Sequence, residues 1–144
     1  MAFRGQHEHS LDSKDRLTIP AKLRSALADG VVLFAGFDPC VEVWPTAAFE
    51  TFTERSLGGL NPMGGKFRMM SRRFNAGSED ESLDSAGRVR MAKTMLSHGD
   101  LSGQCVVVGA GDHLEVWSPE RWASTSDHID AEAGGIAEAI AEED

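Results

Sequence analysis

The chain has 144 residues, enough for one compact domain, or for two small lobes that share a core, without disulfides or metals. It shows no secretory leader and no apolar stretch of membrane-spanning length, so the sequence predicts a cytoplasmic protein with no membrane partner. The net charge of −9 argues against a nucleic-acid partner, but residues 127–144 hold seven acids and no lysine or arginine. The basic residues gather at 4–24, 66–73 and 88–93, and local fields govern binding more than the total charge does.

The first half of the chain combines strand, helix and hairpin signals. Apolar and polar residues alternate over 16–19, as in a half-buried strand. Pro20 is typical of the first turn of a helix and Gly30 fits just past the end of one, so a helix is expected between them. Two apolar runs, 31–37 and 41–44, flank an Asp-Pro step and predict a β-hairpin.

The middle and the end of the chain differ in composition from the first half. Residues 58–65 are rich in glycine and predict a linker. The segment 66–77 places apolar side chains on one helical face and arginines on another, so we expect an amphipathic helix that packs one half of the chain on the other. Residues 101–109 and 114–117 predict a second hairpin. The tail, 127–144, is expected to be loosely ordered or a peripheral helix.

The two halves of the chain repeat one another. Residues 10–13 and 82–85 both read SLDS, and each copy is followed by an arginine three residues later. The sequence VEVW at 41–44 likewise matches LEVW at 114–117. A repeat of half the chain length predicts two copies of one α+β, β-rich unit rather than a solenoid. The predicted divisions are a first repeat at 1–57, a linker and amphipathic helix at 58–78, a second repeat at 79–126 and an acidic tail at 127–144.

Each repeated turn opens with an aspartate and closes with an arginine. The side chain of Asp12 or Asp84 can accept hydrogen bonds from backbone N–H groups two or three residues further on and so close the loop. The residue before the arginine, Asp15 or Gly87, lies where a left-handed conformation is useful. The aspartate can also pair with the arginine and hold its direction. From the short motif alone, a structural turn without a ligand is the commoner interpretation.

These features resemble the MraZ family, part of the wider AbrB/MazE-like group of swapped-hairpin DNA-binding proteins. The resemblance extends to about Ile129 and rests on FRG at 3–5, LDSKDRLTIPAKLR at 11–24, LDSAGR at 83–88, the paired EVW strands and the Asn61-Pro62 step. It implies two tandem copies of an AbrB/MazE-like double-split β-barrel half with flanking helices, and assembly into a closed ring. It also implies sequence-specific binding to promoter direct repeats of the bacterial division and cell-wall gene cluster.

The chain departs from the family pattern at three places. Asp15 stands where the family usually has glycine, and it adds a negative charge beside the arginine of the first turn. Met91-Ala92 stands where the first copy has Ile19-Pro20, which leaves the second helix start less defined. The tail is unusually rich in alanine, glycine and glutamate, and the resemblance implies nothing about its role.

The two motif arginines are the side chains expected to read base edges, and the neighbouring basic residues are expected to hold phosphates. The predicted DNA-contacting residues are Arg16, Lys14, Lys22, Arg24, Arg88, Arg4 and Arg90, and the predicted turn-stabilising residues are Asp12, Asp84 and Gly87. The sequence therefore predicts a nucleoid-associated transcriptional regulator whose partners are double-stranded DNA and further copies of itself.

Two other classes of protein remain open. An enzyme is disfavoured, because His7 and His9 have no third metal ligand at motif spacing. Apart from His113, which lies at a turn, Cys40 and Cys105 also have no nearby histidine in the arrangement of a catalytic nucleophile. Both cysteines are expected to be reduced core residues, and no cofactor, metal site or catalytic residue is predicted. The second alternative is an antitoxin-like, oligomeric partner-binding module of the same fold group that does not bind DNA.

Overall fold

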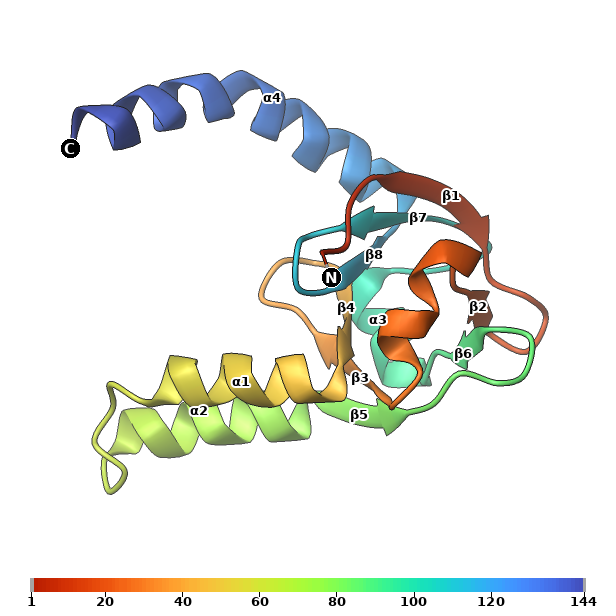
Figure 1. Ribbon diagram of the computed structural model, residues 1–144, viewed down its shortest axis with the longest axis horizontal. Helices are drawn as coiled ribbons and strands as arrows, with labels where there is room; N and C mark the ends of the chain where they lie inside the picture. The colour runs from red at the N-terminus through yellow and green to blue at the C-terminus, as the bar shows by residue number, and fades with distance from the viewer. Residues whose placement is uncertain (1, 144) are drawn as a thin grey trace.

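The structure is a computed structural model that describes residues 2–143. Within that range the chain forms an α+β fold in which strands dominate the body and helices project from it (Figure 1). The elements in chain order are β1 (Gln6–Ser10), β2 (Arg16–Thr18), two short 3-10 helices η1 (Ala21–Leu23) and η2 (Ser25–Leu27), β3 (Val31–Ala35), β4 (Val41–Pro45), α1 (Thr46–Leu57), α2 (Gly65–Ala76), β5 (Ser78–Glu81), β6 (Arg88–Arg90), α3 (Lys93–Gly99), β7 (Gln104–Gly109), β8 (Leu114–Trp117) and α4 (Pro119–Glu142).

The two repeats exchange strands within one sheet. The six-stranded sheet has the order β1-β7-β8-β4-β3-β5, and β2 and β6 form a separate two-stranded ribbon. The first strand of each repeat therefore pairs with the hairpin of the other repeat: β1 with β7, and β5 with β3. Strands β1, β7 and β8 of this order correspond to β5, β3 and β4, so the strand order is the same when it is read from either edge of the sheet. A pseudo-two-fold axis thus passes between β4 and β8 and between β2 and β6.

The two faces of the sheet bury different cores. Alternation along the strands sends Val31, Leu33, Val41 and their counterparts in the second repeat to one face, where the β2–β6 ribbon, the 3-10 helices and α3 cover them. On the other face a smaller aromatic cluster fixes the α1–α2 helical hairpin to the sheet. The members of this cluster are Val32, Phe34, Trp44, Phe49 and Phe74.

The fold class predicted from the sequence is confirmed, and three local details are refined. Two 3-10 turns replace the helix expected after Pro20, where no side chain caps the helix start and no acidic residue lies in the first turn. The amphipathic helix is α2, but Phe74 packs it against the first repeat rather than between the two repeats. The tail continues α4 as a helix to Glu142, started by the Ser118 Oγ cap and by Pro119 at the first position.

Both cysteines are buried free thiols, as expected from the sequence. Cys105 lies in the core, where burial raises the pKa of its thiol to about 11. Across residues 2–143, no helix combines the length and the apolar character needed to cross a membrane.

Candidate nucleic-acid interface

The first turn is closed by the side chain of Asp12. Its Oδ1 accepts hydrogen bonds from the backbone N–H groups of Lys14 and Arg16, both at 2.9 Å. Its Oδ2 accepts from Nε of Arg16 at 2.8 Å, which forms an ion pair within the turn. Asp15, the residue before the arginine, is left-handed with φ 58°. One carboxylate therefore fixes both the backbone of the turn and the direction of the arginine.

The second turn reproduces this geometry. Asp84 Oδ1 accepts from the backbone N–H groups of Ala86 at 3.0 Å and Arg88 at 2.9 Å, and Oδ2 accepts from Nε of Arg88 at 2.8 Å. Gly87 holds the left-handed position with φ +76°. The hydrogen bonds from the arginine backbone N–H are the main reason that the pKa values of Asp12 and Asp84 lie below the ordinary aspartate value. Both carboxylates are therefore ionised at neutral pH.

The two turns are joined into one unit by the β2–β6 ribbon. Ile19 N–H donates to the carbonyl of Gly87, and Met91 N–H donates to the carbonyl of Asp15, so the left-handed residue of each turn receives a bond from the other repeat. The ribbon register pairs Arg16 with Arg90, Leu17 with Val89 and Thr18 with Arg88. Leu17 and Val89 are fully buried, and successive strand residues alternate between faces. The outer face of the ribbon thus carries three arginines and one threonine.

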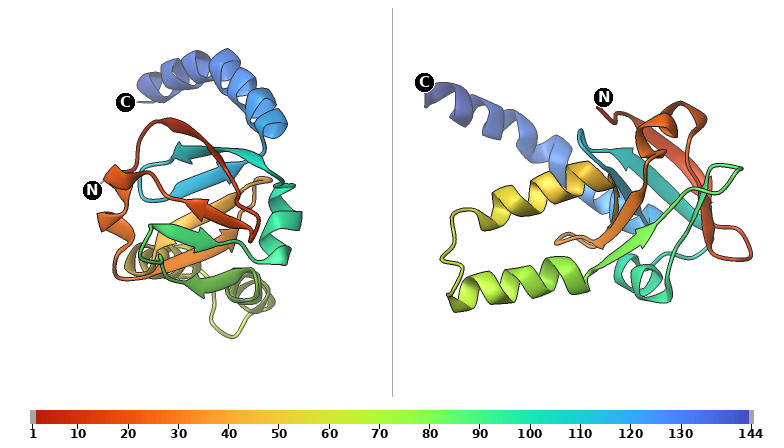
Figure 2. Two further views of the ribbon diagram at one scale, coloured as in Figure 1. Left: turned by 90° about the vertical axis from the view of Figure 1, so that its right-hand side faces the viewer. Right: turned by 60° about the horizontal axis from the view of Figure 1, so that its bottom comes forward.

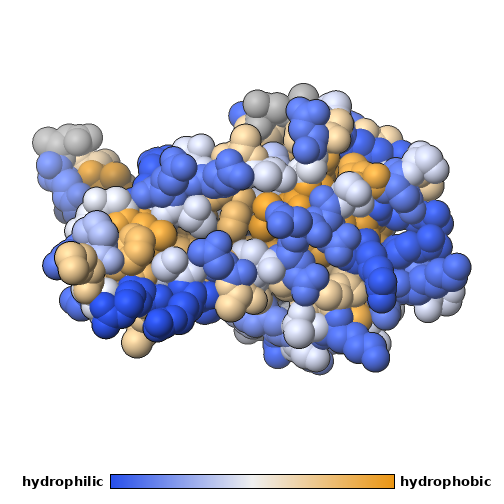
Figure 3. Space-filling model, turned by 90° about the horizontal axis from the view of Figure 1, so that it is seen from below, coloured by the Kyte–Doolittle hydropathy of each residue, from blue (hydrophilic) through white to orange (hydrophobic). Residues whose placement is uncertain are grey.

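The ribbon and its turns form one end of the molecule, opposite the helical projections. This end faces the viewer in the left view of Figure 2. Seen from below in Figure 3, the surface at this end is mostly hydrophilic. A hollow on it is lined by Lys14, Asp15, Arg16 and Arg90. Asp12 and Asp84 each accept a side-chain hydrogen bond only from Nε of their arginine. Within residues 2–143, the terminal guanidinium nitrogens of Arg16 and Arg88 therefore have no hydrogen-bond partner.

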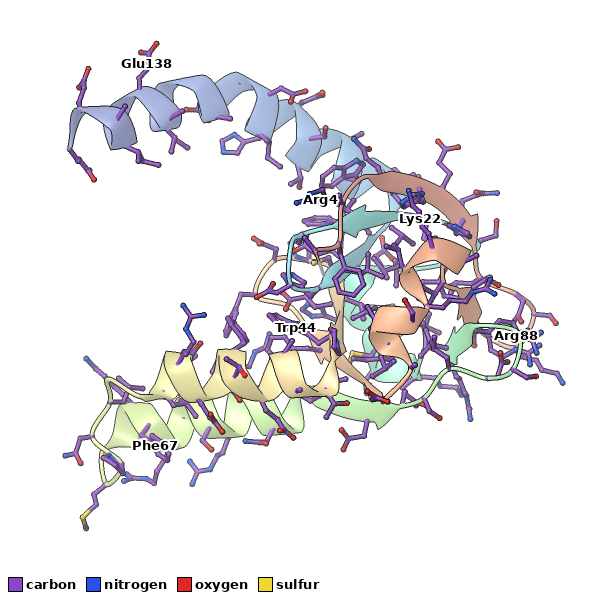
Figure 4. The ribbon with its side chains drawn as sticks, in the orientation of Figure 1. Arg4, Lys22, Trp44, Phe67, Arg88 and Glu138 are labelled. Atoms are coloured by element: carbon purple, nitrogen blue, oxygen red, sulfur yellow. The ribbon has the colours of Figure 1, made fainter. Side chains whose placement is uncertain are left out.

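The other predicted DNA-contacting residues lie further from this surface or are partly engaged. Lys22 is exposed on η1, which is set back from the labelled Arg88 toward the body of the molecule (Figure 4). Arg24 donates through Nε to the carbonyl of Ile19 at 2.9 Å and packs against Gly87, so it braces the ribbon. Arg4 precedes β1, at the end of that strand away from the first turn, and lies far from Arg88 in Figure 4.

The sequence did not identify two residues, one on the candidate surface and one that stabilises the fold. Thr18 lies on the outer face of the ribbon opposite Arg88, and the alternation of residues along this strand could have identified it. Arg73, grouped with a basic cluster by sequence, donates to the carbonyls of Ala35 and Gly36 and lies over the Phe34 ring. The contacts of Arg73 join residues 38 positions apart, so no local pattern signals them.

The exchanged strands, the pseudo-two-fold axis and the paired Asp-Arg turns define a swapped-hairpin protein of the AbrB/MazE-like kind, with two copies fused in one chain. The family model described as "MraZ protein, putative antitoxin-like" matches residues 2–60 and 74–139. The chain belongs to the MraZ family.

Individual relatives match over nearly the whole chain. The transcriptional regulator MraZ of Roseiflexus castenholzii is 38% identical over 141 residues, which cover 97% of each chain. The protein of the same name from Symbiobacterium thermophilum is 36% identical over 138 residues, 96% of each chain. That from Lactobacillus delbrueckii subsp. bulgaricus is 34% identical over 136 residues, 94% of each chain.

Proposed function

We propose that this protein is a sequence-specific DNA-binding transcriptional regulator that uses the outer face of the β2–β6 ribbon and its two turns. The observation that carries the proposal is the pair of arginines whose Nε atoms are held by Asp12 and Asp84. A guanidinium held in this way keeps its two terminal nitrogens for a bidentate contact with guanine. Relatives that span nearly the whole chain are named transcriptional regulators, which supports the same function.

The shape of the ribbon suits the proposed contact. A two-stranded antiparallel ribbon fits the major groove of B-form DNA, where base edges carry a distinct pattern of donors and acceptors. Lys14 and Arg90 flank Arg16 on this surface and would contact phosphates. Lys22 lies behind the turns and would reach only the adjacent backbone. Arg24 would act mainly by bracing the ribbon, and Arg4 would contact DNA only if the duplex curved around the molecule.

We further propose that several copies form a closed ring that binds direct repeats in the promoter of the division and cell-wall gene cluster. One ribbon offers only a few contacts, and a ring presents one ribbon per subunit to successive sites along the DNA. Two projections of the molecule fit a head-to-tail contact. The helix α4 exposes a stripe of Ile129, Ile136 and Ile140 among acidic residues, and α2 exposes Met69 between Lys66 and Arg72.

The ring contact is tested by replacing both Ile136 and Ile140 with aspartate. These side chains are 56% and 60% exposed, so the change should leave the fold intact and remove the apolar stripe from the interface. We expect light scattering to show a large fall in mass at micromolar concentration. The control is Arg16→Ala, which should keep the oligomer. A wild-type monomer, or an unchanged oligomer in the double variant, would reject the α4 contact.

DNA binding is tested by footprinting the region upstream of the gene with purified protein at several salt concentrations. We expect protection of short repeated sites. We also expect the logarithm of the binding constant to fall linearly and steeply with the logarithm of salt concentration, because each neutralised phosphate releases counterions. A protein that shifts no upstream fragment at moderate salt would instead be the partner-binding module of the same fold group. A flat salt dependence would exclude the basic ribbon as the contact surface.

A further inference from the structure

The pseudo-two-fold axis brings two matching sets of side chains together on the outer face of the sheet. Along β4 and the loop before it the sequence is Cys-x-Glu-x-Trp, residues 40–44, and along β8 it is His-x-Glu-x-Trp, residues 113–117. Glu42 and Glu115 are direct cross-strand partners. Their side chains are only 12% and 19% exposed, so two like charges face each other in a poorly solvated place. Such a pair is destabilising unless positive charge lies beside it, and His113, 3.2 Å from Glu115 and 4.0 Å from Glu42, supplies that charge when its ring is protonated.

Each carboxylate is oriented by an indole. Trp44 Nε1–H donates to Glu42 Oε1 at 2.9 Å, and Trp117 Nε1–H donates to Glu115 Oε1 at 3.0 Å. Trp44 itself is buried beside the start of α1 (Figure 4). Each indole engages only Oε1 of its glutamate, and Oε2 of Glu115 lies 3.2 Å from Nε2 of His113. Cys40 completes this side of the cluster: its thiol is fully buried and has no hydrogen-bond partner within residues 2–143.

His113 is held as metal-binding histidines usually are. Its Nδ1 lies 2.7 Å from a carboxylate oxygen of Asp112, and its ring stacks on Trp44 with 4.3 Å between centroids and 9° between planes. These contacts fix the ring and direct Nε2 into the cluster, 3.2 Å from Glu115 and 4.0 Å from Glu42. A histidine whose Nδ1–H donates to a carboxylate presents Nε2 to a metal in the same way.

We propose that Cys40, Glu42, His113 and Glu115 bind a divalent cation of the Zn²⁺ class. One ligand atom from each of Cys40, Glu42 and Glu115 lies within 4.8 Å of the other two. Zn²⁺ bonds of about 2.0–2.3 Å place neighbouring tetrahedral ligands ~3.3–3.8 Å apart, so these three atoms would have to draw closer together around the ion. His113 stands outside this group of three and would join it through Nε2, which lies 3.2 Å from Glu115 and 4.0 Å from Glu42. The mixed sulfur, nitrogen and oxygen donors favour Zn²⁺ over Mg²⁺ or Ca²⁺. The cation would also replace cross-strand repulsion with a link between the two repeats.

The test is a Co²⁺ titration of the full-length protein after removal of metals under reducing conditions. Co²⁺ takes the same tetrahedral geometry as Zn²⁺ and reports a bound thiolate by a charge-transfer absorption band. We expect saturation at one Co²⁺ per chain, with displacement by Zn²⁺. Cys40→Ser should remove the charge-transfer band. Glu42→Gln and Glu115→Gln, which keep an oxygen for the indole bond, should each weaken Co²⁺ binding by roughly tenfold or more.

Cys105→Ser is the matched control, because Cys105 is also a buried free thiol but lies on the core side of the sheet. It should keep the band and the affinity. Circular dichroism shows whether each variant is folded. If Cys40→Ser does not fold, the Co²⁺ affinities of Glu42→Gln and Glu115→Gln test the site. The proposal is overturned if wild-type protein gives no saturable band, if the band survives in folded Cys40→Ser, or if both glutamine variants bind Co²⁺ as wild type does. These readouts do not involve DNA.

Discussion

Replacing Arg16 by alanine is expected to weaken specific DNA binding by about 1–3 kcal/mol per engaged turn and to relax discrimination between sequences. The side chain is directed by its bond to Asp12, and Arg90 lies directly opposite it in the ribbon. Residues 4–24 hold five basic and three acidic residues, a net charge of +2. With several turns bound to one duplex, the losses multiply.

Arg88→Ala is the matched control and should cost less. Arg88 faces Thr18 rather than another cation, and residues 79–99 hold three basic and four acidic residues, a net charge of −1. The measurement is fluorescence anisotropy at one stated salt concentration, with a specific and a scrambled duplex and with light scattering for each variant. Equal losses from the two substitutions would reject the asymmetry but keep the function. If Arg16→Ala dissociated the oligomer, the turn from Asp12 to Arg16 would be a structural element rather than a DNA contact.

The sequence was most informative where structure depends on neighbouring residues. The Asp-Arg turns and the two hairpins are set by short-range chemistry, since the side-chain hydrogen bonds of Asp12 reach residues two and four positions further on. The strand exchange was not derivable from local patterns, because β1 pairs with β7 across about a hundred residues. The resemblance to the MraZ family, rather than periodicity, supplied the swapped-hairpin expectation.

Side-chain clusters that form across the pseudo-two-fold axis were also invisible in the sequence. Cys40 was expected to be a core residue and His113 a turn residue, yet the register of β4 with β8 places both beside the glutamate pair. Arg24 was grouped with the phosphate-holding residues, and that role stays a prediction. The structure adds a contact that the sequence did not signal, from Nε of Arg24 to the Ile19 carbonyl, which depends on how the 3-10 helices fold back on the ribbon.

Replacing Gly87 by alanine is expected to destabilise the protein more than the same change at Gly103. Both glycines are left-handed, with φ +76° and +66°, so both substitutions carry the cost of about 1–2 kcal/mol for an L-residue in that conformation. A Cβ at Gly87 would also lie 2.5 Å from Cδ and Cζ of Arg24, whereas a Cβ at Gly103 meets nothing within 4 Å. Overpacking of this kind adds roughly 1–3 kcal/mol.

Urea unfolding of the two single variants measures this difference, and a double-mutant cycle with Arg24→Ala identifies its cause. Removal of the Arg24 side chain should abolish the extra cost of Gly87→Ala while leaving that of Gly103→Ala unchanged, because only Gly87 touches it. Gly87→Ala should also weaken DNA binding, since displacing Arg24 breaks its bond to the Ile19 carbonyl and loosens the ribbon. Equal destabilisation at the two glycines, or additive effects in the cycle, would show that Arg24 moves aside freely and does not brace the second turn.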